Sequence, residues 1–77
     1  MTKYTYKNLN DNDKDATIGA LYYELYQSNM RGEKISMVRE VIENLENYEF
    51  EISRNLRTYI HIFKNKSFQG SIVTARK

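Results

Sequence analysis

The spacing of apolar residues changes near Tyr48, from the period of a helix to the period of a strand. Before that point, two segments repeat apolar residues at intervals of three and four positions, which is typical of helices with one buried face. After it, three segments alternate between apolar and polar residues, as strands with one buried face do. The two helical stripes comprise Ile18, Leu21, Tyr22, Leu25 and Tyr26, and then Ile35, Val38, Val41, Ile42 and Leu45. The chain is therefore expected to pack two helices against a sheet.

Three strands are predicted after Tyr48, over residues 49–54, 57–64 and 68–76. The short polar links around Asn55 and residues 65–67 suit hairpins, which favours an antiparallel meander. The side chains on one face are Phe50 and Ile52, then Ile60 and Ile62, then Phe68, Ile72 and Thr74. The other face takes Glu49, Glu51 and Ser53, then Tyr59, His61 and Phe63, then Gln69, Ser71, Val73 and Ala75.

The N-terminal residues complete the predicted layout. Residues 3–7 alternate, with Tyr4 and Tyr6 on one side, and predict a short first strand. Asp13 or Asp15 is expected to cap the first helix, and Gly32 is expected near its C-terminal end. The result is one α+β domain over residues 1–77, in the order β-α-α-β-β-β, with both helices packed on one face of a small antiparallel sheet.

The composition limits the chain to a small, unreinforced core. Its 77 residues include no cysteine, so disulfides and cysteine-based zinc sites are excluded. The absence of cysteine agrees with a reducing compartment, and we expect the protein in the cytoplasm. Its apolar runs are too short for a membrane span or a signal peptide.

Residues that support catalysis are not grouped in this sequence. His61 is the only histidine, so no set of metal ligands can be assembled around it. Every aspartate lies within residues 11–15, and each of the three glycines stands alone, which excludes a Ser-His-Asp triad and a glycine-rich phosphate loop. We therefore expect no enzyme activity, no metal and no cofactor.

The charged residues are segregated along the chain. All ten acidic residues lie between Asp11 and Glu51, whereas the last 26 residues carry six cations and no carboxylate. The net charge is only +2. Because the acidic block covers the helices and the first strand of the meander, the two signs are expected on different layers of one domain. This pattern concerns partners rather than fold.

The strand over residues 57–64 carries the candidate binding surface. If the helices cover Ile60 and Ile62, then Tyr59, His61 and Phe63 project from the opposite face. The basic residues expected around these three side chains are Arg54, Arg57, Lys64 and Lys66. Such a face suits a protein interface, in which aromatic side chains are buried and cations set the register and rate of association.

Other interpretations stay open at this point. Aromatic rings flanked by cations also suit the bases and phosphates of a nucleic acid. The cations alternatively protect the sheet edges, and the acidic helix face is either a solvated surface or a mimic of phosphates. Two helices joined by residues 29–34 also suggest a helix-turn-helix, but Glu40, Glu43 and Glu46 on the second helix would repel DNA.

The β-α-α-β-β-β order also resembles the RelE family of small ribosome-dependent ribonuclease toxins, whose sheet carries Arg, Lys, Tyr and His. Residues of suitable types in this chain are Arg54, Arg57, Tyr59, His61 and Arg76. The resemblance covers the order of elements only, so no functional residue is carried over from the family. It implies RNA cleavage as a third possible function.

The interpretation favoured by these observations is a small, non-enzymatic, cytoplasmic binding protein that forms a homodimer. Its expected partner is another protein, with a nucleic acid as the alternative and no role at a membrane. The abundance of Asn, Lys, Ile and Tyr is typical of AT-rich genomes. It favours an accessory or inhibitory factor of a phage or mobile element that acts on a host protein.

Overall fold

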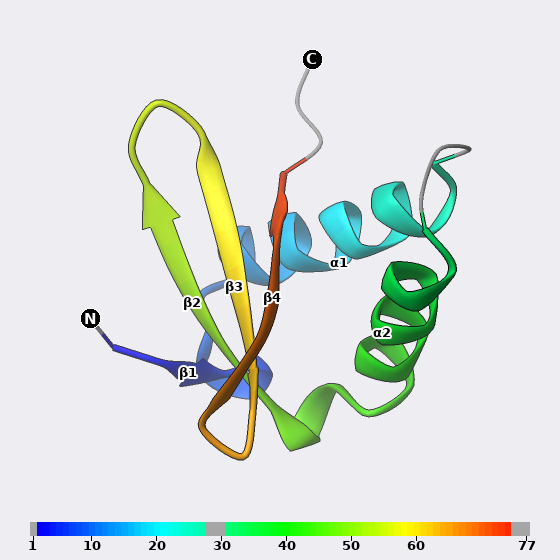
Figure 1. Ribbon diagram of the computed structural model, residues 1–77. Coiled ribbons are helices and arrows are strands. Elements are labelled where there is room, and N and C mark those ends of the chain that lie inside the picture. The colour runs from blue at the N-terminus through cyan, green and yellow to red at the C-terminus, as the bar shows by residue number, and fades with distance from the viewer. Residues whose placement is uncertain (1, 28–30, 75–77) are drawn as a thin grey trace.

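The computed structural model describes residues 2–27 and 31–74, and it confirms the predicted α+β architecture (Figure 1). The sheet is antiparallel and four-stranded in the order β1-β2-β3-β4, and both helices lie on one side of it. The elements in chain order are β1 (Tyr4–Thr5), the 3-10 turn η1 (Tyr6–Asn8), α1 (Asp11–Leu25), α2 (Gly32–Glu43), the 3-10 turn η2 (Leu45–Asn47), β2 (Tyr48–Arg54), β3 (Thr58–Lys64) and β4 (Ser67–Val73). In the described residues, no helix is long and apolar enough to cross a membrane.

The first strand is shorter than the sequence predicts. β1 pairs with β2 through Tyr4 and Thr5 only, and the chain then bends into η1. The bend turns the Tyr6 ring onto the edge of the Phe50 ring, with centroids 6.4 Å apart at 73°. An edge-to-face contact of this kind stabilises a small core beyond the area that it buries.

Helix α1 follows its predicted stripe in part, since Leu21 is buried and Ile18 and Leu25 pack against the core. Thr17, Ala20 and Leu21 are buried, whereas Tyr22 and Tyr26 are 43% and 78% exposed. The tyrosine rings lie toward solvent, where their hydroxyls can stay in water. The predicted cap is also wrong, because the Asn10 side chain accepts the N–H of Asp13 at 2.8 Å.

Helix α2 follows its predicted pattern. Val38 and Val41 are fully buried, and the acidic outer side, which includes Glu40 and Glu43, is exposed. Gly32 does not end α1 but begins α2, and its φ is not positive. Residues 28–30, part of the predicted turn, lie outside the described residues.

Strands β2 to β4 form the predicted meander. Phe50 lies opposite Ile62, and Ile60 lies between Ile52 and Ile72, so the apolar side chains of three strands meet under the helices. The β3–β4 link is a two-residue turn in which Asn65 and Lys66 have φ values of 53° and 68°. Positive φ at both positions matches the right-handed twist of a hairpin.

A β-bulge near Phe63 overturns the predicted face of Phe68. Ile62 lies opposite Gly70 but Phe63 lies opposite Phe68, so Gln69 is an extra residue without a partner on β3. The extra residue reverses the alternation before it. Phe68 therefore points away from the helices rather than into the core.

Candidate partner-binding face

Four rings meet on the side of the sheet that faces away from the helices. This aromatic face consists of Tyr59, His61 and Phe63 from β3 and Phe68 from β4. The Tyr59 and His61 rings stack with centroids 6.4 Å apart, and Phe68 lies 6.4 Å from His61 and 5.5 Å from Phe63. Tyr59 is 38% and Phe68 60% exposed. Partly exposed rings in one continuous patch mark a surface suited to a partner.

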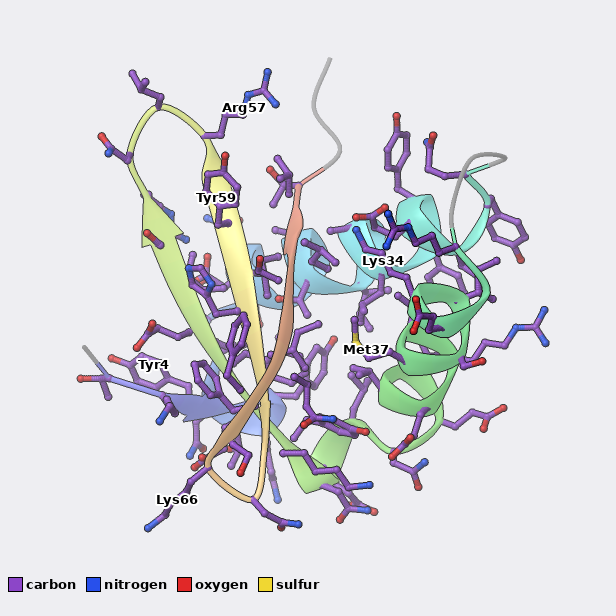
Figure 2. All side chains as sticks on the ribbon, viewed as in Figure 1. Tyr4, Lys34, Met37, Arg57, Tyr59 and Lys66 are labelled. Atoms are coloured by element: carbon purple, nitrogen blue, oxygen red, sulfur yellow. The ribbon has the colours of Figure 1, made fainter. Side chains whose placement is uncertain are left out.

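Sequence reasoning missed Phe68 as a member of this face. A signal for the bulge is nevertheless present, because the segment from Ser67 to Val73 alternates poorly and contains Gly70. A side chain at Gly70 would approach the Met37 side chain, since an added Cβ would lie 3.3 Å from its Cε. Figure 2 shows Met37 directed from α2 toward the sheet.

Two carboxylates adjoin the rings. Glu49 lies directly opposite Phe63, and Glu51 lies directly opposite His61, both from the neighbouring strand β2. Side chains at opposed positions of an antiparallel pair lie on the same face, within reach of each other. Glu49 and Glu51 therefore stand beside the aromatic face, half-buried.

A cation from the N-terminal arm also reaches the aromatic face. The Lys3 Nζ lies 4.3 Å from the centroid of the Phe63 ring. This is the geometry of a cation–π interaction, in which the ammonium is attracted by the electron-rich face of the ring. Lys3 precedes β1. Within the described residues, this N-terminal arm pairs with the sheet through Tyr4 and Thr5 alone.

Two of the predicted rim cations lie on the opposite side of the sheet. Arg54 forms an ion pair with Asp13 near the start of α1. Lys64 reaches Glu40 of α2, with Nζ 2.5 Å from Oε2. Alternate residues of a strand share one face of the sheet. Arg54 therefore lies on the same face as Ile52, and Lys64 lies on the same face as Ile62.

The other two predicted cations stand at the ends of the meander. Arg57 belongs to the β2–β3 loop and Lys66 to the β3–β4 turn, and they lie at opposite ends of the strands (Figure 2). The structure therefore brings together Tyr59, His61 and Phe63 as predicted, but not the basic rim.

The Lys64–Glu40 pair is part of a small polar network against the core. The Tyr48 hydroxyl donates to Glu40 Oε2 at 2.6 Å, and the Lys64 Nζ lies 5.5 Å from the Tyr48 ring centroid. Hydrogen bonds from Lys64 and then Tyr48 lower the pKa of Glu40. Burial, and then the hydrogen bond to Glu40, raise the pKa of Tyr48. This network connects α2 to the sheet, away from the aromatic face.

Residues of the types shared with the RelE family are divided between the two faces of the sheet. In residues 2–27 and 31–74, no group of three or more His, Asp or Glu side chains is placed to hold a metal ion. Among the types shared with the RelE family, Arg54 is on the helix side while Tyr59 and His61 are on the other, and Arg76 lies outside the described residues.

Comparisons with known protein families, with curated proteins and with solved structures found no match to this chain. Its function is therefore inferred from the fold and from the residues of the aromatic face.

Proposed function

We propose that this protein is a small binding domain that captures a partner protein on its aromatic face and has no catalytic activity of its own. The observation that carries this proposal is the contiguous arrangement of Tyr59, His61, Phe63 and Phe68 on the side of the sheet away from the helices. Aromatic side chains dominate the buried centres of protein interfaces, where they exclude water from neighbouring polar contacts.

The charges beside the rings favour protein over nucleic acid. A strand of RNA or DNA stacked on these rings would bring its phosphates close to Glu49 and Glu51. Lys64, one of the cations expected beside the rings, instead pairs with Glu40 on the helix side, and Arg54 pairs there with Asp13. Nucleic-acid affinity depends chiefly on cations that replace counterions at the phosphates.

The homodimer predicted from the sequence remains a proposal, and β4 is the segment that best supports it. This edge strand has neither charge nor proline over Ser67–Val73, and edges without such protection readily pair with other strands. The Thr74 N–H donates to the Thr58 carbonyl at 3.1 Å, so the alternation of the ladder directs the N–H of Ser71 away from β3.

We propose antiparallel pairing of two β4 strands. Ser71→Pro removes an outward N–H while leaving the β3–β4 ladder in place, and it should yield a monomer by light scattering. A wild-type protein that is monomeric at every concentration would contradict the dimer.

The small size of the domain and its abundance of amino acids typical of AT-rich genomes support a role as a phage or mobile-element factor that inhibits or assists a host protein. This role needs only a stable surface, which the fold supplies.

The experiment that tests partner capture compares three immobilised proteins in lysate of the source organism, with and without nuclease treatment. They are the wild type, Tyr59→Ala with Phe68→Ala, and the control Tyr22→Ala with Tyr26→Ala, which removes two exposed rings from α1. We expect one protein to be retained by the wild type and the control and lost by the first variant. Retention of that protein by all three, or retention that disappears with nuclease, would contradict the proposal.

A further inference from the structure

The aromatic face carries two carboxylates beside its rings although the protein is basic overall. Its cross-strand neighbours Glu49 and Glu51 are carboxylates, whereas Arg54 and Lys64 are turned toward Asp13 and Glu40 on the helix side. The net charge of +2 therefore does not describe this surface. A partner at short range responds to the charges beside it, because exposed charges farther away than about 10 Å are screened by salt.

Rings beside carboxylates form an environment suited to cations. The face of an aromatic ring attracts ammonium and guanidinium groups, and an adjacent carboxylate adds a charge-assisted hydrogen bond. The opposed positions of Phe63 with Glu49, and of His61 with Glu51, place a ring and a carboxylate side by side twice along the face. The spacing between these two pairs is that of alternate residues in an extended chain, about 7 Å.

The protein already places one cation there. Lys3 lies with its Nζ 4.3 Å from the Phe63 centroid, on a short N-terminal arm held by the two residues of β1. The structure thus contains an internal example of ammonium recognition at this surface. An arm paired through so few residues can be displaced by a competing cation at small free-energy cost.

We propose that the aromatic face recognises a lysine- or arginine-rich segment of its partner protein, and that Lys3 occupies part of this site in the free protein. The cations of that segment stack on the exposed rings and pair with Glu49 and Glu51. This inference rests on the proposed function and specifies the chemistry of its partner.

The test uses defined probes rather than a natural partner. A fluorescently labelled Arg-Gly repeat peptide, a Glu-Gly repeat peptide and a single-stranded oligonucleotide are titrated with the wild-type protein. We expect binding of the Arg-Gly peptide, weakened by added salt, and no binding of the Glu-Gly peptide. Tighter binding of the oligonucleotide than of the Arg-Gly peptide would overturn the proposal in favour of a nucleic acid.

Two matched pairs of carboxylates locate the binding. Glu49→Gln with Glu51→Gln keeps the shape of the face and should weaken the Arg-Gly peptide about tenfold, as expected for the loss of two partly exposed ion pairs. Glu43→Gln with Glu46→Gln removes the same charge from exposed positions outside the sheet and should leave the affinity unchanged. Equal effects of both variants would show that only net charge matters and would overturn the assigned site.

Lys3 supplies an effect of the opposite sign. Lys3→Ala frees the Phe63 ring and should strengthen binding of the Arg-Gly peptide about threefold, whereas the control Lys7→Ala, at an exposed position in η1, should have a smaller effect. If only net charge mattered, Lys3→Ala and Lys7→Ala would strengthen peptide binding equally. That result would contradict the proposal that Lys3 occupies the site in the free protein.

The two proposals fail in distinguishable ways. If the partner is lost with Tyr59→Ala and Phe68→Ala but retained with Glu49→Gln and Glu51→Gln, then the aromatic face binds protein but not through cations. If the aromatic variant retains the partner, the proposed function itself is wrong.

Discussion

The two faces of the sheet are built from the same strands but differ in what they bury and in the charged residues beside them. On the helix side, Ile60 and Ile62 of β3 are fully buried, and the cations Arg54 and Lys64 pair with acids from the helices. On the other side, rings are partly exposed and the neighbouring strand contributes carboxylates. In a thin domain, the position of a residue along the chain therefore says little about which face of the sheet it lies on. Whether it occupies an odd or an even position within its strand says much more.

This difference assigns stability to one face and binding to the other. The helix side contains the apolar cluster that must offset the loss of chain entropy on folding. The aromatic face contributes less because its rings keep part of their contact with water. Variants that separate stability from binding can test this division.

The largest expected effect comes from the core side of β3. Ile62→Ala should lower the free energy of unfolding by about 3 kcal/mol, since it removes fully buried methyl groups and leaves a cavity. Tyr59→Ala, on the same strand but 38% exposed, should lower it by about 1 kcal/mol or less. Urea denaturation followed by circular dichroism measures both. Equal losses would show that the aromatic face belongs to the core.

An intermediate effect is expected from the two arginines near the β2–β3 loop. Arg54→Met leaves the Asp13 carboxylate, whose side chain is only 11% exposed, without its cation. Loss of the Arg54 cation should lower the free energy of unfolding by about 1 to 2 kcal/mol. This is less than for a fully buried ion pair, because Arg54 is itself largely exposed. Arg57→Met is the matched control and should change the unfolding free energy by less than about 0.5 kcal/mol. A larger loss for Arg57→Met would contradict the assignment of Arg54 to the helix side.

The smallest expected effect is a pH dependence carried by the polar network on the helix side. Because the folded pKa of Glu40 is lowered, its contribution to stability is present above its ordinary value of 4.5 and is lost as the pH falls through the folded value. The stability difference between wild type and Glu40→Gln should therefore shrink below pH 4.5.

The Tyr48 hydroxyl makes the stability depend on pH in the alkaline range as well. Its pKa is raised, so its contribution is present below the ordinary value of 10.0 and is lost as the pH rises through the folded value. Tyr48→Phe keeps the ring and should flatten the stability profile above pH 10. Chemical denaturation across pH measures both limbs. An unchanged acid limb in Glu40→Gln would show that Lys64 and Glu40 do not interact in solution.

The sequence predicted the architecture well where the apolar pattern was regular. The alternation in residues 49–54 and 57–64 identified which side chains of β2 and β3 face the helices, and three members of the aromatic face follow from it. The same alternation also places Arg54 with Ile52 and Lys64 with Ile62. The expected basic rim was wrong because those cations were assigned by their place in the chain rather than by their parity.

Two other errors have causes that a pattern of apolar residues does not contain. The buried residues of α1 include the polar Asp13 and Thr17, and the Asp13 side chain forms an ion pair with Arg54 of β2. The face of Phe68 depends on the bulge at Gln69, which the poor alternation and Gly70 suggest but do not locate. A contact between distant elements decides the first case, and the pairing within the β3–β4 hairpin decides the second.

The bulge at Gln69 has a consequence for how such a surface changes in evolution. If Gln69 were deleted, Gly70 would still lie opposite Ile62 and Phe68 opposite Phe63, so Phe68 would stay on the aromatic face. If Gln69 were kept but paired regularly with β3, the alternation would instead turn Phe68 toward the helices. The face of this ring therefore tolerates loss of the extra residue but not loss of the bulge around it.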